Sequence, residues 1–247
     1  MSAHPIEVVG HGGAGHFFPG NSRSSVQKAV DLGVDRIEID LVAAAGGELL
    51  LVHDRILKDE AGKKLKVRSL PVERVRELVD ELLTLEEFFE LIGPTFPVLL
   101  DLKQPGYEAA VADAIKRQTG RDIWISTSHA RSIFWLQRRL PKIRTGLSTG
   151  HVASGFPNSR FEPIVVRVVR AITPFPLLIA AKLCGATMIM VNFRAGSPWL
   201  VRVAQAGGLP VAVWTVNRPA DIQRMAAMNV DAIISNRPDL VREIVQD

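Results

Sequence analysis

Short runs of apolar and β-branched residues alternate along the chain with longer segments that have helical periodicity. Strands are predicted at about residues 6–10, 35–41, 48–52, 97–102, 122–127, 143–148, 187–192, 210–215 and 231–234. Helices are predicted near residues 22–32, 71–80, 84–92, 107–118, 130–140, 160–183, 198–206, 219–228 and 238–246. Alternation at this spacing is typical of βαβ units, which build a parallel sheet.

Several local signals agree with this alternation. The runs PVLLDLK, TMIMVN and PVAVWTV are nearly all apolar, as expected for strands covered on both faces. Ser22 can cap the helix that follows it, and Gly33 suits the C-terminal end of that helix. Thr84 followed by Glu87 is a capping-box pattern at the start of another helix.

Polar residues gather where the predicted strands end. They are His11, Glu38, Asp40, His53, Asp101, Lys103, Ser126, Ser128, Asn192, Trp214, Asn217, Ser235 and Asn236. In a closed barrel of parallel strands these ends form one rim, and such barrels hold their active sites there. An open doubly wound sheet usually has a Gly-rich phosphate loop leading into a helix, and the stretch GHGGAGHFFPG lacks G-x-G-x-x-G spacing ahead of an immediate helix. The sequence therefore predicts an α/β fold, a (β/α)₈ TIM barrel, as a single domain over residues 1–247.

The composition excludes several classes of protein but does not indicate a function. Apolar residues make up 47% of the chain and charged residues 23%, as in an ordinary globular protein. The net charge is +4, but the basic residues are scattered, so no nucleic-acid partner is expected. Cys184 is the single cysteine, which excludes an intrachain disulfide. The N-terminus has no signal-peptide pattern and no run of 18 apolar residues occurs, so a cytoplasmic location is expected.

The stretch VDRIEID raises the question of a metal site. Side chains two residues apart on a strand lie on one face, so Glu38 and Asp40 come close together. Two adjacent carboxylates repel each other unless a positive charge lies between them. That charge could be Arg36 or Lys103 in a purely structural ion pair, or a bound cation; the spacing alone leaves both open.

The order of motifs resembles the glycerophosphodiester phosphodiesterase family. The resemblance extends from His11 to Pro238 and rests on H-x-G, P-x-N-S, GVDRIEID, HD, LTLEEFF, LLDLK, VWTVN and VDAIISNRP. It implies a TIM barrel of the PLC-like phosphodiesterase type, with a short insertion after the second strand. It also implies metal-dependent hydrolysis of glycerophosphodiesters to an alcohol and glycerol 3-phosphate.

The resemblance also assigns roles to residues. His11 and His53 match the family's acid–base histidines, and Trp214 stands where a tryptophan lines the substrate site. The implied metal ligands are Glu38, Asp40 and Asp101, and Lys103 would contact the phosphate. A ligand set made only of oxygen suits Mg²⁺ or Ca²⁺ better than Zn²⁺.

The first motif departs from the family pattern. The family's His-Arg-Gly is here His11-Gly12-Gly13, so an arginine that would touch phosphate is missing. We expect the backbone N–H groups of Gly12 and Gly13 to approach the phosphate instead, because glycine allows close approach. Arg23 or Arg194 could also supply the lost guanidinium.

Other departures accompany the first one. The family's Pro-Glu-Asn-Thr here has Gly20 in place of Glu, so an acid is lost together with the arginine, and neither leaves an unpaired buried charge. Asp101 is one methylene shorter than the family's usual Glu. The family's closing Thr-Asp is here Ser235-Asn236.

Two features leave the substrate open. Only about thirty residues separate Asp54 from Thr84, which predicts an open mouth that could admit a lysophospholipid. Residues 156–183 combine aromatic and apolar side chains with arginines, as an interfacial helix would in peripheral contact with a membrane. The alternative for this segment is a packed barrel helix broken at Pro174 and Pro176.

Three functions are therefore retained from the sequence. The first is hydrolysis of soluble glycerophosphodiesters. The second is a lysophospholipase D acting on membrane lysophospholipids, and the third is a metal-binding barrel that has lost catalysis. The headgroup, the metal and the oligomeric state are not specified by the sequence.

Overall fold

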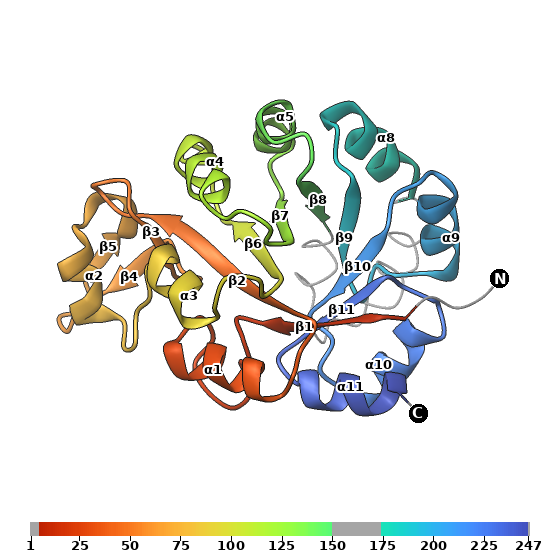
Figure 1. The fold of residues 1–247 in the computed structure, drawn as a ribbon, viewed down its shortest axis with the longest axis horizontal. Coiled ribbons are helices and arrows are strands. Elements are labelled where there is room, and N and C mark those ends of the chain that lie inside the picture. Colours follow the sequence, from red (N-terminus) through yellow and green to blue (C-terminus); the bar gives the residue numbers. More distant parts are fainter. Residues whose placement is uncertain (1–4, 150–173, 247) are drawn as a thin grey trace.

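A closed barrel of eight parallel strands organises the computed structural model of the chain, which describes residues 5–149 and 174–246 (Figure 1). Going around the barrel, the order is β1, β11, β10, β9, β8, β7, β6, β2, and the pairing of β1 with β2 closes it. The strands are β1 (Glu7–His11), β2 (Arg36–Ala43), β6 (Val98–Leu102), β7 (Ile123–Thr127), β8 (Arg144–Thr149), β9 (Met188–Asn192), β10 (Val211–Trp214) and β11 (Ala232–Ser235). The predicted (β/α)₈ barrel is confirmed.

Three short strands lie outside the barrel, after β2. β3 (Leu49–Leu51) pairs antiparallel with β2, as part of the same sheet. β4 (Ile56–Lys58) and β5 (Lys64–Lys66) form a separate antiparallel hairpin. The apolar pattern of the sequence predicted β3 but not this hairpin. Its strands are three residues long and rich in lysine, so they lack the apolar alternation by which a strand is recognised.

Helices form the outer layer around the strands (Figure 1). They are α1 (Arg23–Asp31), α2 (Val72–Leu78), α3 (Leu85–Leu91), α4 (Glu108–Lys116), α5 (Ala130–Arg139), α8 (Pro174–Cys184), α9 (Pro198–Ala206), α10 (Pro219–Ala226) and α11 (Pro238–Gln246), with a 3₁₀ turn η1 (Val67–Ser69). None of the helices in the described ranges is both long and apolar enough to span a bilayer.

The predicted interfacial segment 156–183 falls mostly outside the described residues. Its last part is α8, which runs on through Pro176, and whether a helix breaks at Pro174 concerns residues outside the described ones. Pro174 begins α8 and Pro176 lies in its first turn, where a missing N–H group breaks no helical hydrogen bond.

The predicted helix caps are present. The Ser22 side chain accepts a hydrogen bond from the backbone N–H of Ser25 at the start of α1. Thr84 and Glu87 form both hydrogen bonds of a capping box at the start of α3. These caps fix where the two helices begin, which in turn fixes the loops that lead into them from the barrel rim.

The interior of the barrel is filled by side chains from alternate strand positions. The buried members of this cluster are Val9, Leu99, Trp124, Met188, Met190, Ala212, Ala232 and Ile234. Trp214 is half-buried and packs against them at the carboxyl end of β10. The filled interior makes a floor, above which the polar rim lies.

Arg36 ties four strands together at the amino end of the barrel. Its guanidinium is buried and donates to the Glu7 carboxylate at 2.8 Å and to the Val98 carbonyl oxygen at 3.0 Å. It also donates to the Asp122 carboxylate at 2.5 Å and stacks 3.7 Å from the centre of the Trp124 ring. Its partners are therefore not Glu38 and Asp40, so one structural explanation for those two acids is excluded.

We predict that Arg36→Ala lowers the free energy of unfolding by about 3 kcal/mol, because charge-assisted hydrogen bonds of about 1.5–3 kcal/mol and a buried stack are lost together. Urea unfolding of the variant and the wild type measures this difference in the free energy of unfolding. Arg117→Ala is the matched control, since Arg117 makes an exposed ion pair with Glu86, and such a pair contributes about 0–1 kcal/mol. Equal losses in the two variants would contradict the role given to Arg36.

Candidate active site

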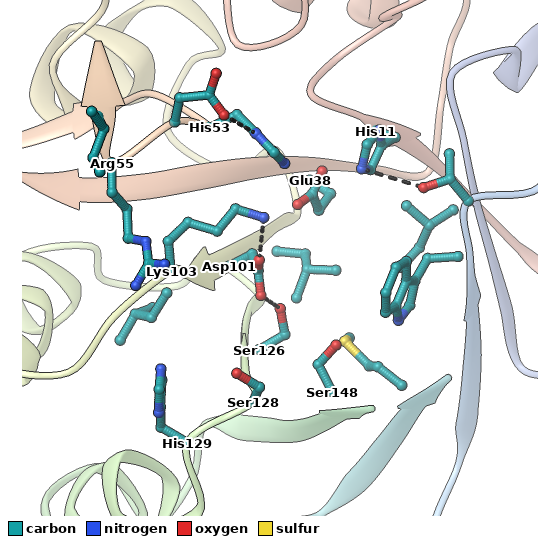
Figure 2. A pocket seen from close by; sticks show the side chains of 18 of the residues that line it. His11, Glu38, His53, Arg55, Asp101, Lys103, Ser126, Ser128, His129 and Ser148 are labelled. Carbon is teal, nitrogen blue, oxygen red and sulfur yellow. Dashed lines mark hydrogen bonds and ion pairs between the residues drawn. The ribbon is translucent and has the colours of Figure 1, made fainter. Parts of the chain in front are cut away.

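A pocket of about 870 Å³ opens at the carboxyl end of the barrel strands (Figure 2). Six of the residues singled out in the sequence line it: His11, Glu38, His53, Asp101, Lys103 and Trp214. They come from β1, β2, β6, β10 and the loops that follow strands, so the fold brings together side chains up to 203 positions apart in sequence. Ser126 and Ser128, also expected at the rim, line the same pocket.

Three carboxylates converge beside this pocket. Glu38 and Asp40 extend from β2, and Asp101 extends from the neighbouring strand β6, where it is the register partner of Asp40. Each offers an oxygen that lies within 4.8 Å of the others. Glu38 and Asp40 are almost fully buried, so their charges are poorly screened by water.

Lys103 partly balances these charges. Its ammonium lies 2.5 Å from Asp40 Oδ1 and 2.7 Å from Asp101 Oδ2. Burial acts to lower the pKa of Lys103, but the carboxylates of Asp101 and Asp40 outweigh it and raise that pKa. Burial likewise acts to raise the pKa of Asp40, and Lys103 together with His11 holds that pKa below its usual value.

Glu38 is left with too little positive charge around it. Burial and the adjacent Asp40 raise the pKa of Glu38 well above its usual value. Three carboxylates against one ammonium give a net charge of about −2 when all are ionised. A divalent cation matches both this charge and the all-oxygen donor set, so the residues present fit a hard metal ion.

The two histidines are held in different ways. His11 Nδ1 lies 2.7 Å from the Asn236 side-chain oxygen. Because an amide oxygen only accepts, Nδ1 carries hydrogen and Nε2 keeps the lone pair in the neutral ring. Burial lowers the pKa of His11. His53 is exposed, with Nδ1 2.9 Å from Asp54 Oδ1, and in Figure 2 the two rings lie on either side of Glu38.

Two asparagines support the site although the sequence had assigned neither of them a role: Asn21, and Asn236, which was expected only at the rim. Asn21 donates to Asp40 Oδ2 at 2.8 Å and accepts from the backbone N–H of Asp40 at 2.9 Å. It does so from a left-handed backbone conformation (φ 67°), which asparagine tolerates better than most residues. Asn236 orients His11. Asn21 lies in the P-x-N-S motif, and that motif was the available signal.

The glycines of the first motif do not have the predicted role. The N–H of Gly12 donates to Glu38 Oε2 at 2.9 Å, and the N–H of Gly13 donates to the Glu38 backbone oxygen at 3.3 Å. These N–H groups are thus occupied by Glu38, and neither glycine lines the pocket. The expectation that they contact phosphate is corrected: they help to hold Glu38 in place.

The two sequence departures meet in space. A Cβ atom on Gly12 would lie 3.0 Å from Gly20 Cα, which is tight contact. Gly12 and Gly20 stand where the resemblance led us to expect arginine and glutamate. Their adjacency agrees with the inference that a positive and a negative side chain were lost together, because each would have been the other's neighbour.

Besides the predicted Lys103, three cationic side chains that were not predicted line the pocket: Arg55, Lys58 and Lys64. Neither Arg23 nor Arg194, the two arginines considered from the sequence, lines it. In Figure 2, Arg55 lies on the opposite side of Lys103 from His11. The sequence signal was present in the basic stretch that follows His53-Asp54, but without the hairpin nothing directed that stretch toward the site.

Comparison with known proteins decides the family. Residues 11–240 match the model of the glycerophosphoryl diester phosphodiesterase family. The chain belongs to this family. Membership makes the protein a phosphoric diester hydrolase and confirms the resemblance drawn from the motifs.

Individual relatives are distant but cover the whole chain. A glycerophosphodiester phosphodiesterase of Caldanaerobacter subterraneus is 26% identical over 259 residues, with 97% of each chain covered. Among solved structures, a Galdieria sulphuraria putative glycerophosphodiester phosphodiesterase gives a TM-score of 0.81 at 18% identity, covering 100% of both chains. An Oleispira antarctica phosphodiesterase, solved in complex with the product sn-glycerol-3-phosphate, gives a TM-score of 0.79 at 17% identity, covering 98% of both chains.

We predict that Asn21→Ala weakens binding of Mg²⁺ or Ca²⁺ by about 10–100-fold, the usual effect of removing a group that orients a metal ligand. Isothermal titration calorimetry with each metal ion measures the affinity. Asn21→Gly should weaken binding to the same extent without adding backbone strain. Asn229→Ala introduces alanine at another left-handed position (φ 56°) away from the site, and it should leave affinity unchanged. Full affinity in both Asn21 variants would show that Asp40 needs no such support.

Proposed function

We propose that the protein hydrolyses glycerophosphodiesters to an alcohol and glycerol 3-phosphate in a metal-dependent reaction with two acid–base histidines. The observation that carries the proposal is the convergence of Lys103, two histidines and the carboxylates of Glu38 and Asp101 on a single pocket, with Asp40 beside them in the same acidic cluster. Phosphodiesters resist attack because the phosphate is anionic and the leaving alkoxide is poor. The proposal requires the site to address both obstacles.

Glu38, Asp40 and Asp101 would hold the cation, Mg²⁺ or Ca²⁺. When bound, such an ion polarises a phosphoryl oxygen and offsets charge that develops in the transition state. Asn21 and the Gly12 N–H fix two of the ligands by hydrogen bonds of 2.8–2.9 Å. Ser126 donates a hydrogen bond to Asp101 and fixes the third.

Lys103 has a second role in this scheme. Its ammonium now balances Asp40 and Asp101, and a divalent ion shared by the same carboxylates would take over that balance. The ammonium would then be available to a phosphate oxygen as a point charge. This reconciles the structural ion pair with the phosphate contact predicted from the sequence.

His11 is suited to accept a proton. Asn236 occupies its Nδ1, burial favours the neutral ring, and Nε2 keeps a lone pair for the attacking hydroxyl. His53, oriented by Asp54, would donate a proton to the departing oxygen. Trp214 lines the pocket above the filled barrel interior, where its ring offers an apolar surface to the carbon chain of glycerol.

We predict that hydrolysis of glycerophosphocholine requires a divalent cation, stops in EDTA, and falls about 10²–10⁴-fold in kcat in His11→Ala or His53→Ala. Release of glycerol 3-phosphate, coupled to its dehydrogenase, measures the rate. His16→Ala is the matched control, because His16 is exposed on the loop after β1 and does not line the pocket.

Choline is released from both glycerophosphocholine and lysophosphatidylcholine, so a choline assay with each substrate separates the lysophospholipase D alternative from the leading one. Preference for the lysolipid would replace the soluble diester as the substrate. Undiminished turnover in His11→Ala would remove the two-histidine mechanism. If metal binds but no diester is hydrolysed, the third alternative, a barrel without catalysis, would stand.

A further inference from the structure

The β4–β5 hairpin presents positive charge to the mouth of the pocket. Arg55, Lys58 and Lys64 line the same cavity as the acidic cluster, and all three side chains are exposed. Ile56 lies among them, 49% exposed. One wall of the pocket is therefore cationic, whereas the wall on the His11 side includes the apolar side chains of Met190, Trp214 and Ile234.

The register of the hairpin explains why these lysines face the pocket. Lys58 pairs directly with Lys64, and Leu57 pairs with Leu65. Because side chains alternate along a strand, the leucines and the lysines lie on opposite faces of the hairpin. Leu57 packs against a cluster of buried residues that includes Val42, Leu50 and Val75 of the neighbouring elements. Anchoring of the leucine face turns the lysine face toward the cavity.

The charges on this face are not neutralised by the hairpin itself. Like charges directly opposite each other across a strand pair are destabilising. Within the described residues, no ion pair involves Arg55, Lys58 or Lys64. Two of the nearby acids have other partners: Asp54 contacts His53, and Asp59 accepts from the N–H groups of Ala61 and Lys63 in the turn.

The reacting phosphate does not account for these cations. A phosphodiester carries a single negative charge, and under the proposed function that charge is met by the metal ion and Lys103 at the acidic cluster. Arg55, Lys58 and Lys64 are three further cations that line the pocket, and a second anionic group on the substrate would match their charge. The pocket, at about 870 Å³, is large enough to hold a diester with a sizeable alcohol.

We infer that the preferred substrates are glycerophosphodiesters whose alcohol half carries an additional anionic group, such as a phosphate monoester, and that Lys58 and Lys64, with Arg55, bind that group. The inference rests on the proposed function and specifies its substrate class. Lysine and arginine donate charge-assisted hydrogen bonds to phosphate oxygens, and these bonds are stronger than neutral ones. The repulsion between Lys58 and Lys64 is relieved when an anion lies between them.

The experiment compares two substrates that differ by one phosphate, glycerophosphoinositol and glycerophosphoinositol 4-phosphate. In the wild-type protein, kcat/KM should be about tenfold higher for the phosphorylated substrate, as one or two charge-assisted contacts at a solvent-open site would give. The preference should narrow at about 0.5 M salt because exposed charges are screened. The double variant Lys58→Gln/Lys64→Gln should lose the preference while kcat/KM for glycerophosphoinositol changes less than about twofold.

The control is Lys63→Gln/Arg68→Gln, which removes two positive charges in the turn between β4 and β5 and in η1, at exposed residues that do not line the pocket. It should keep the preference. The thermal midpoint of Lys58→Gln/Lys64→Gln should not fall below that of the wild type, since a like-charge pair is removed. A stable double variant therefore separates a binding role from a folding role.

Each outcome decides the inference. Equal turnover of the two inositol substrates by the wild type would overturn it and leave the proposed function intact. Hydrolysis of neither would overturn the proposed function and the inference with it. If the double variant keeps the preference but no longer sediments with phosphatidylserine vesicles, the hairpin binds an anionic membrane surface, and the inference is overturned in favour of that role.

Discussion

Mutual repulsion among Glu38, Asp40 and Asp101 is the constraint on which the rest of the rim depends. Adjacent parallel strands place Asp40 and Asp101 in register, and the period of β2 places Glu38 beside them. Water cannot screen them well, because Glu38 and Asp40 are buried. The neighbouring groups are arranged around that repulsion: Lys103 balances two of the acids, Asn21 and Gly12 donate hydrogen bonds, and Ser126 donates to the third acid.

Near this cluster, Gly12 and Gly20 occupy the positions where the family resemblance led us to expect an arginine and a glutamate. Gly12 and Gly20 lie against each other in the loop between β1 and α1, and a Cβ atom at Gly12 would already lie 3.0 Å from Gly20 Cα. Restoring arginine at position 12 alone would bury a cation beside a partner that is missing. The cationic side chains that line the pocket are instead Lys103 and, from the β4–β5 hairpin, Arg55, Lys58 and Lys64. A shared fold thus holds different arrangements of charge around the same carboxylates.

The sequence predicted the barrel strands because each has its own apolar run and is long enough to be recognised. It also placed the principal side chains of the site, since parallel strands bring their carboxyl ends to one rim. What it missed depends on tertiary contacts. The hairpin has little apolar pattern of its own and is held by Leu57 packing on a neighbouring cluster. From the sequence, the N–H groups of Gly12 and Gly13 were assigned to phosphate. In the structure the Gly12 N–H donates to the Glu38 carboxylate and the Gly13 N–H donates to the Glu38 backbone oxygen. Such contacts between distant segments cannot be seen in the sequence.

Closure of the barrel holds the first histidine in a different way from the carboxylates. His11 ends the first strand, and the side chain that orients it, Asn236, follows the last strand, 225 residues later. β1 itself pairs with both β2 and β11. The contact that orients His11 therefore joins the two ends of the chain and depends on the pairing of β11 with β1. The three carboxylates lie on β2 and β6, which pair directly, so their arrangement is independent of that closing pair.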